Sequence, residues 1–153
     1  LVPGPDSEAL ASHVQLLDEF LFHEHQKGQL KLPLRKISQE KIWVHGHCHQ
    51  KAANATGSTL GILKTIPGLE VELIPSSCCG MAGSFGYESE NYEISMKMAE
   101  LSLLPKIRTL DQNHGIVACG TSCRQQIQHG SGKPAMHTAQ ILRQAISDAS
   151  SIN

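Results

Sequence analysis

The feature that most constrains the fold is an alternation of short apolar segments with segments of helical periodicity. The apolar segments are residues 41–45 (KIWVH), 70–74 (EVELI), 115–118 (GIVA) and, more briefly, 135–137. Helical patterns separate them, at 50–65, from Ser89 to a kink or end at Pro105, and from Thr121 or Ser122 to Gly130. Short strands that alternate with helices indicate βαβ units. The pattern predicts an α/β fold with an about four-stranded, mostly parallel sheet and helices on both faces.

Helices are also expected at the two ends of the chain. An amphipathic helix is predicted at 6–27, with Gly28 ending it and with apolar positions at helical spacing: Leu10, Val14, Leu17 and Leu21. A last helix capped by Thr138 turns four residues inward: Ile141, Leu142, Ala145 and Ile146. The α/β core is thus expected at 41–147, within one domain at 1–153 that ends in a frayed tail at 148–153. Because the chain begins with Leu1, we expect it to be a fragment of a larger protein.

Composition and charge exclude several classes of protein. Hydrophobic residues make up 40 % of the chain, which is enough for a packed core. Lys and Arg number 13 against 14 Asp and Glu, and no basic run is present, so we expect no nucleic-acid partner. No apolar run is long enough for a transmembrane segment. Five cysteines, an odd number, argue against a fully paired secreted scaffold and favour a cytoplasmic protein.

The cysteines follow the predicted strands. Cys48 comes after the first strand, Cys78 and Cys79 after the second, and Cys119 and Cys123 after the third. The carboxyl ends of parallel strands share one edge of a sheet, where open α/β folds bind their ligands. Four or five thiolates at one edge suit a soft metal, either zinc or iron in an iron–sulfur cluster. The sequence therefore predicts a metal centre at this edge.

Other residues near the cysteines are expected to support this centre. Gly80 and Gly83 let the backbone approach a bulky ligand and donate N–H groups to it. His47 and His49 are expected to hold thiolates or loop backbone by hydrogen bonds rather than to bind the metal. His45, inside the first strand, is interpreted as structural.

Three more side chains lie near the predicted centre. His137, at the end of the predicted fourth strand, could reach it. Lys51 and Arg124 each closely follow a cysteine, and they would either lower the pKa of its thiol or be solvated helix side chains.

Three segments together resemble the cysteine-rich CCG domain. They are HGHCHQKA (45–52), SSCCGMAGSFGYE (76–88) and CGTSCRQQI (119–127). That domain occurs in one subunit of heterodisulfide reductase and in the iron–sulfur proteins of glycolate oxidase, anaerobic glycerol-3-phosphate dehydrogenase and lactate utilisation. The likeness covers residues 6 to 147. It is strongest to the C-terminal iron–sulfur region of bacterial fusion proteins that carry an FAD-linked D-lactate or D-2-hydroxyacid dehydrogenase.

The family pattern is Cys, a gap of about thirty residues, Cys-Cys-Gly, a gap of thirty-odd, and Cys-x-x-Cys. Here 29 residues separate Cys48 from Cys78, but three rather than two separate Cys119 from Cys123. The Gly-Thr-Ser-Cys block makes Cys123 the firmer match, and Cys119 is either a ligand or a bystander. The resemblance thus implies Cys48, Cys78, Cys79 and Cys123 as metal ligands, with Cys119 optional.

The resemblance implies an electron-transfer module with a [4Fe–4S] cluster, which is noncubane in some members of the family and replaced by zinc in others. The partners would be upstream FAD and ferredoxin-type domains that oxidise a D-2-hydroxy acid, and an unknown electron acceptor. The parent protein would be cytoplasmic or membrane-associated through its partners, and this chain alone would not be catalytically complete. Two alternatives stay open: a zinc-binding structural or docking domain, and a metal-free thiol–disulfide redox module.

Overall fold

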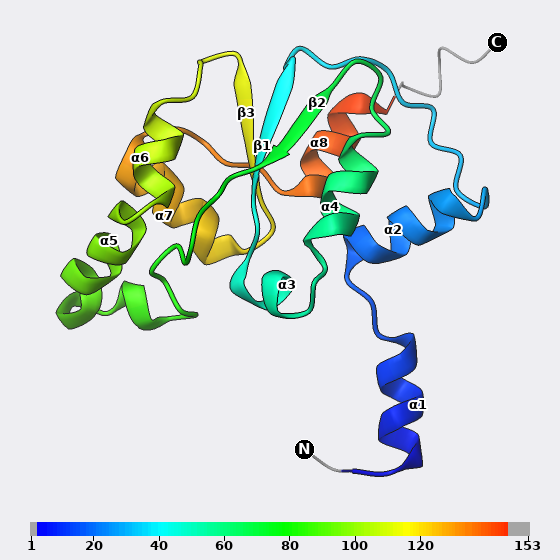
Figure 1. The fold of residues 1–153 in the computed structure, drawn as a ribbon, viewed down its shortest axis with the longest axis horizontal. Coiled ribbons are helices and arrows are strands. Elements are labelled where there is room, and N and C mark those ends of the chain that lie inside the picture. The colour runs from blue at the N-terminus through cyan, green and yellow to red at the C-terminus, as the bar shows by residue number, and fades with distance from the viewer. Residues whose placement is uncertain (1–2, 147–153) are drawn as a thin grey trace.

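The structure is a computed structural model that describes residues 3–146 (Figure 1). Its first part contains α1 (Pro5–His13), α2 (Leu17–Gln26), β1 (Lys41–His45), α3 (Cys48–Ala52), α4 (Thr56–Leu63) and β2 (Glu70–Leu73). Two 3₁₀ turns follow, η1 (Phe85–Tyr87) and η2 (Ser89–Asn91). The remainder contains α5 (Tyr92–Glu100), α6 (Leu103–Arg108), β3 (His114–Ala118), α7 (Thr121–Ser131) and α8 (Thr138–Ala145).

The sheet has three parallel strands in the order β2-β1-β3. The predicted α/β class and the parallel pairing are confirmed, but the expected fourth strand is wrong. In its place Met136 makes a single parallel bridge with Val117. Pro134 lacks an N–H group on one side of this bridge, and His137 becomes the N-cap of α8 on the other. Only one residue is therefore left to pair.

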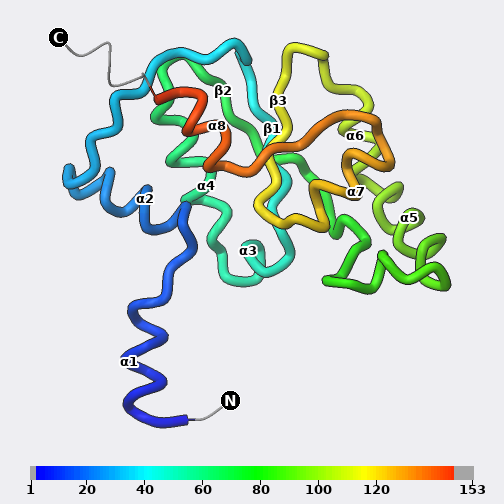
Figure 2. The backbone as a smooth tube through the Cα atoms, turned by 180° about the vertical axis from the view of Figure 1, so that it is seen from behind, coloured from blue at the N-terminus to red at the C-terminus, as the bar shows by residue number. Residues whose placement is uncertain are grey.

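Helices cover both faces of the sheet, as expected (Figures 1 and 2). The first face packs Ile42, Val44, Val71 and Val117 against α4 and α8, with α2 outside them. The opposite face packs Trp43, Ile116 and Ala118 against α6 and α7. Alternate residues of each strand face opposite sides, so β1 and β3 contribute to both cores, whereas the edge strand β2 contributes Val71 to the first core alone. His45 follows Trp43 by two residues and therefore belongs to the second face.

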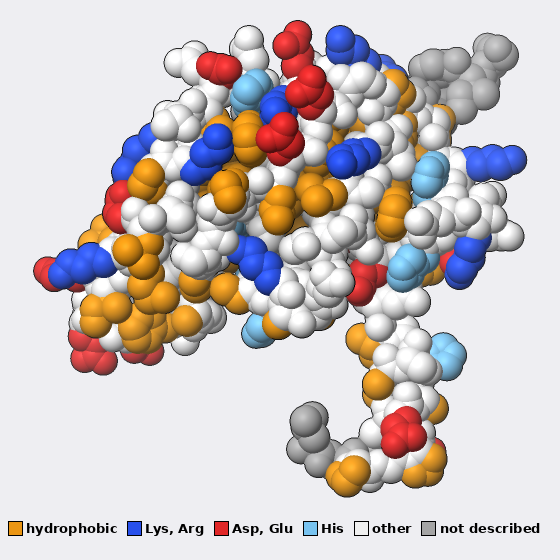
Figure 3. All heavy atoms as spheres, in the orientation of Figure 1, with side chains coloured by type: hydrophobic (Ala, Val, Ile, Leu, Met, Phe, Trp, Pro, Cys, Tyr) orange, Lys and Arg blue, Asp and Glu red, His pale blue; other side chains and the backbone are white. Residues whose placement is uncertain are grey.

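The predicted helix at 6–27 is two helices, broken at residues 14–16. The first, α1, has no buried residue and projects away from the body (Figure 3). Of the four apolar positions expected on one helix face, Leu10, Val14 and Leu17 are exposed, and only Leu21 packs against the core. The second, α2, contacts α4 where the ring of Phe22 lies against Gly61. The helical periodicity was predicted correctly, but α1 projects from the body and has no core to cover.

Other boundaries also differ from the sequence prediction. The helix at 50–65 is split into α3 and α4, with Asn54 at a positive φ of 54° between them. Pro105 neither ends nor kinks a helix, because it lies in the first turn of α6, where its missing N–H costs nothing. The next helix, α7, runs to Ser131 and ends at left-handed Gly132. Ile146 is partly exposed beyond α8, and the expected tail at 148–153 lies outside the described residues. Within residues 3–146, no helix combines the length and the apolar content needed to cross a membrane.

The contact between α2 and α4 can be tested with two glycines of the same helix. A Cβ at Gly61 would overlap the ring of Phe22, whereas a Cβ at Gly57 would meet nothing within 4 Å. Gly57→Ala is expected to raise the free energy of unfolding by ~0.5–1 kcal/mol through helix propensity. Gly61→Ala is expected to lower it by about 1–3 kcal/mol through overpacking. Urea denaturation measures both, and equal changes would contradict the packing of α2 on α4.

Candidate metal centre

Loops at the carboxyl end of the sheet place four cysteines on one side of its edge. Cys48 is the first residue of α3, directly after β1. Cys78 and Cys79 lie in the loop that follows β2, and Cys123 is the third residue of α7, after β3. The Sγ atoms of Cys48 and Cys78 are 3.5 Å apart. Those of Cys79 and Cys123 are 3.2 Å apart. Residues from three separate loops therefore meet as two sulfur pairs.

A buried histidine lies beside the second pair. One ring nitrogen of His45 and the sulfurs of Cys79 and Cys123 all lie within 4.8 Å of one another. All three residues are at most 3 % exposed. This group of one nitrogen and two sulfur donors can hold a metal ion. Within residues 3–146 it is the one group of three or more such donors close enough to do so.

The two sulfur pairs are electrostatically linked. The pKa of Cys79 is lowered to about 4, chiefly because the Cys123 thiol donates a hydrogen bond to it, with help from the Met81 N–H. The pKa of Cys123 is raised correspondingly, first by the same Cys79 sulfur and then by burial. Burial, followed by the adjacent Cys78, raises the pKa of Cys48. Cys79 is thus a thiolate at neutral pH. The neighbouring sulfurs oppose ionisation of Cys48 and Cys123, and a bound cation would offset this effect.

The loop after β2 is held by specific contacts. Gly80 donates its N–H to the Sγ of Cys78 at 3.3 Å. A Cβ at Gly80 would overlap the backbone carbonyl of Ser95 in α5, so a glycine is required there by packing as well as by its φ of 87°. Gly83 has a φ of 71° with open space around it. Lys51 donates to the carbonyls of Ser76 and Ser77, at 2.5 and 2.8 Å.

The side chains of Lys51 and Arg124 are therefore not simply solvated. Lys51 ties the β2 loop to α3, and its charge favours the thiolate of Cys48. Arg124 donates to the carbonyls of Ala118 and Cys119, at 2.9 and 2.7 Å. Both cations fasten the loops that carry the cysteines.

His47 and His49 act on the backbone around α3. The Nδ1 of His47 accepts the N–H of His49 at 3.2 Å, which caps α3. Burial, followed by the neighbouring His49, lowers the pKa of His47. Its ring lies against Gly120, where a Cβ would come within 2.5 Å of the His47 Cδ2 and 3.1 Å of the Cys123 Sγ. His47 therefore borders the sulfur cluster, and the His49 ring stacks edge-on against it with centroids 5.1 Å apart.

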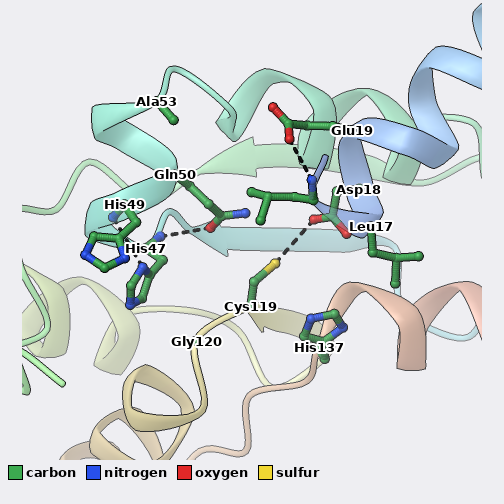
Figure 4. A pocket seen from close by; sticks show the side chains of 11 residues that line it. Leu17, Asp18, Glu19, His47, His49, Gln50, Ala53, Cys119, Gly120 and His137 are labelled. Atoms are coloured by element: carbon green, nitrogen blue, oxygen red, sulfur yellow. Dashed lines mark hydrogen bonds between the residues drawn. The ribbon is translucent and has the colours of Figure 1, made fainter. Parts of the chain in front are cut away.

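Cys119 points to the other side of the sheet edge. Its sulfur lies 3.3 Å from the Oδ2 of buried Asp18 and 3.4 Å from the hydroxyl of Thr138. Figure 4 shows Cys119 and Asp18 at a pocket of about 380 Å³, with His47 and His49 on one side and His137 on the other. His137 caps α8 by accepting the Ala139 N–H at 3.1 Å, and it lines this pocket rather than the sulfur cluster. The structure thus brings four of the five predicted cysteines together and places Cys119 apart.

The pocket occupies the crevice between the ends of β1 and β3. The helix α4, between β1 and β2, packs on one face of the sheet, whereas α7, which follows β3, packs on the other. Such a switch point is where open α/β sheets bind ligands. The sulfur cluster and the pocket therefore lie side by side at the same edge, separated by His47 and Gly120.

The environment of Cys119 gives a test of this arrangement. Burial and then the negative charge of Asp18 raise the pKa of Cys119, which holds the thiol protonated. Asp18→Asn removes that charge with little change in shape, so the pKa of Cys119 is expected to fall and its alkylation to become faster at pH ~8, near the ordinary thiol pKa. Alkylation rates measured by peptide mass spectrometry check this. Slower or unchanged labelling of Cys119 would contradict the contact.

Comparisons with known proteins find relatives of this chain among dehydrogenases and their subunits. No protein-family model matches it, and no solved structure matches it significantly. It is 29 % identical over 143 residues to a subunit of the anaerobic glycerol-3-phosphate dehydrogenase of Escherichia coli K12, a match that covers 92 % of this chain and 35 % of that protein. It is 33 % identical over 116 residues to D-2-hydroxyglutarate dehydrogenase of the same strain, covering 74 % of this chain and 11 % of that protein.

A third relative agrees with these two. The D-2-hydroxyglutarate dehydrogenase of Haemophilus influenzae is 32 % identical over 140 residues, covering 88 % of this chain and 13 % of that protein. The chain thus spans about a third of the first relative and little more than a tenth of the other two. It is homologous to parts of oxidoreductases, and the resemblance seen in the sequence is supported at that level.

Sequence reasoning missed His45 as a candidate metal-binding residue. The available signal was its position: it is the last residue of a strand that leads to Cys48, and it lies on the same face as Trp43. That face turned out to be the one on which Cys79 and Cys123 lie. The order of strands and the face of each loop were needed to see this.

Proposed function

We propose that this chain is the iron–sulfur electron-transfer module of a flavin-linked oxidoreductase that acts on a D-2-hydroxy acid. The observation that carries the proposal is the meeting of two sulfur pairs, Cys48 with Cys78 and Cys79 with Cys123, at one edge of the sheet. These four cysteines would be the metal ligands, and Cys119 is not required. A [4Fe–4S] cluster, which is noncubane in some members of the family, is the group that the resemblance implies.

The residues present fit such a group. The donors are soft sulfur atoms, one of them already a thiolate, and soft donors select iron–sulfur clusters or zinc over hard cations. A buried nitrogen of His45 also faces this site without a hydrogen-bond partner among residues 3–146. The cluster, when bound, accepts and releases one electron at a time.

The surrounding side chains would tune and protect the centre. The Gly80 N–H donates to Cys78, and such hydrogen bonds to ligand sulfur stabilise the reduced, more negative state. Lys51 supplies a positive charge beside Cys48. Cys79 and Cys123 are buried, whereas Cys48 is exposed, so one side of the centre would be open for electron exchange.

The parent reaction is proposed from the relatives. Two of the three named relatives are dehydrogenases of D-2-hydroxyglutarate, a D-2-hydroxy acid. This chain matches a small part of each, so the dehydrogenating flavin site and ferredoxin-type centres would lie elsewhere in the parent protein. The single domain proposed here, 1–153, would receive their electrons and pass them to an acceptor.

A second function is favoured by one observation. The pKa of Cys79 is about 4 and its sulfur lies 3.2 Å from that of Cys123, which suits a thiol–disulfide redox pair. Burial of both sulfurs argues against it, because an attacking disulfide would need to reach them. The metal-centred function is therefore the better supported of the two.

The proposal is tested by anaerobic purification and reconstitution, followed by iron, zinc and acid-labile sulfide analysis with EPR. About four irons with matching sulfide, and a paramagnetic signal in one redox state, are expected for a [4Fe–4S] centre. Stoichiometric zinc without sulfide uptake would replace electron transfer by a structural or docking role. A reversible Cys79–Cys123 disulfide with no metal requirement would support the redox pair instead.

A further inference from the structure

His45 contains an orphaned buried nitrogen. Among the described residues 3–146, its Nε2 is the only buried side-chain nitrogen or oxygen without a hydrogen-bond partner. The side chain is 1 % exposed, so water does not satisfy this atom from outside. An unsatisfied buried polar group costs about 1–3 kcal/mol. A group that completes the site would remove this cost.

Hydrogen bonds on the other side of the ring determine which nitrogen carries the proton. The Nδ1 of His45 lies 2.9 Å from the hydroxyl oxygen of Ser76. That hydroxyl donates its own proton to the carbonyl of Ile74 at 3.4 Å, and a carbonyl can only accept. The Ser76 oxygen is therefore the acceptor and Nδ1 the donor. In the neutral ring, Nε2 then presents a lone pair.

The ring of His45 also lies beside the sulfurs. The imidazole nitrogen and the Sγ atoms of Cys79 and Cys123 lie within 4.8 Å of one another. Metal–sulfur bonds of about 2.3 Å in a tetrahedral site place two sulfurs about 3.8 Å apart, so the three donors need only small movements to share one metal ion. Metal-bound histidines also usually donate their second ring N–H to an oxygen, as His45 does to Ser76.

We propose that His45 binds the metal of this centre through Nε2, which adds one imidazole to the thiolate donors. The inference rests on the metal centre under Proposed function, but not on that centre being an iron–sulfur cluster. Ser76 is then a positioning residue, because it fixes the ring orientation and the tautomer.

The arrangement of β3 and α7 leaves the site without a fifth cysteine. Cys119 points toward Asp18, away from the cluster. The next residue, Gly120, is the one whose Cβ would point toward the Cys123 sulfur, 3.1 Å away. In the Cys-x-x-Cys pattern, with two residues between its cysteines, the partner of Cys123 would stand at that position, and this chain has a glycine there. The imidazole of His45 supplies a donor from β1 instead.

A neutral imidazole as the fifth donor, where the family pattern has a fifth cysteine, has an electronic consequence. It removes one negative charge from the donor set, which raises the reduction potential of an iron–sulfur centre. His45→Cys is therefore expected to shift the potential of the reconstituted centre to more negative values.

The test uses Co²⁺ alone as probe, added to the reduced chain without oxygen. X-ray absorption at the cobalt edge distinguishes sulfur from imidazole ligands, and optical titration gives the affinity. His45→Asn is the main variant, because the asparagine amide can still donate a hydrogen bond to the Ser76 hydroxyl but has no atom in place of Nε2. His114→Ala is the matched control: His114 is also a strand histidine, but it pairs with Lys41 at the opposite end of the sheet.

The wild-type chain and His114→Ala are expected to show imidazole scattering, and His45→Asn to lose it together with more than tenfold in Co²⁺ affinity. Ser76→Ala is expected to weaken Co²⁺ binding by roughly 10–100-fold while keeping the imidazole signal. Unchanged imidazole scattering in His45→Asn, or no Co²⁺ binding by the wild type, would overturn the assignment. A chain that binds Co²⁺ through His45 but takes up no sulfide would instead overturn only the iron–sulfur function.

Discussion

Cys123→Ser and Cys79→Ser are each expected to abolish retention of the reconstituted cluster, whereas Cys119→Ser is expected to keep it. The sulfurs of Cys79 and Cys123 lie 3.2 Å apart in the buried part of the site. Loss of either one removes a ligand that no neighbouring group can replace. Removing a hydrogen-bond partner of a metal ligand lowers metal affinity by about 10–100-fold, and removing the ligand itself should lower it further.

Cys119→Ser is the matched control for this pair. Cys119 is also partly buried at the same edge, but its sulfur contacts Asp18 and Thr138 instead of the other cysteines. A serine hydroxyl can keep both hydrogen bonds, so the fold should be preserved. Iron and sulfide analysis after gel filtration measures retention in all three variants. Full occupancy in Cys123→Ser, or a loss in Cys119→Ser as severe as in Cys79→Ser, would refute the ligand assignment.

The sheet, and the gathering of cysteines at the carboxyl ends of its strands, could be predicted from the sequence because both depend on local patterns. Strands β1 and β3 are short apolar runs, and each is followed by cysteines where the chain leaves the sheet. Parallel pairing then brings those cysteines to one edge whatever the details of the loops. The prediction of a fourth strand failed because a strand needs several consecutive residues that can pair. Pro134 and the helix cap at His137 leave only Met136 to pair with β3.

The division of the edge into two sites could not be predicted from the spacing of residues alone. Cys119 and Cys123 are four residues apart, but one follows the end of a strand and the other lies on the first turn of α7, so their side chains leave in opposite directions. Similarly, Asp18 is far from Cys119 in the sequence, and only the packing of α2 places its carboxylate against that thiol. Long-range packing decides which donors share a site.

Gly80→Ala is expected to destabilise the chain by about 2–5 kcal/mol and to weaken metal binding, with Gly83→Ala as its matched control. Both glycines lie in the loop of Cys78 and Cys79 and have similar positive φ values, 87° and 71°. An alanine in this region costs about 1–2 kcal/mol in backbone strain at either position. Only at Gly80 would the new Cβ also overlap a backbone atom, the carbonyl oxygen of Ser95, adding about 1–3 kcal/mol.

The difference between these variants isolates the contact of the loop with α5. A backbone carbonyl in a helix cannot rotate away as a side chain can, so the loop itself must move and carry Cys78 and Cys79 out of register with Cys48 and Cys123. Gly83→Ala should therefore retain near-normal Co²⁺ binding at a modest loss of stability, while Gly80→Ala should lose both. Urea denaturation of the metal-free chain and Co²⁺ titration measure the two effects separately. Equal losses in the two variants would mean that backbone conformation, and not the close approach of the loop to α5, holds the adjacent cysteines in place.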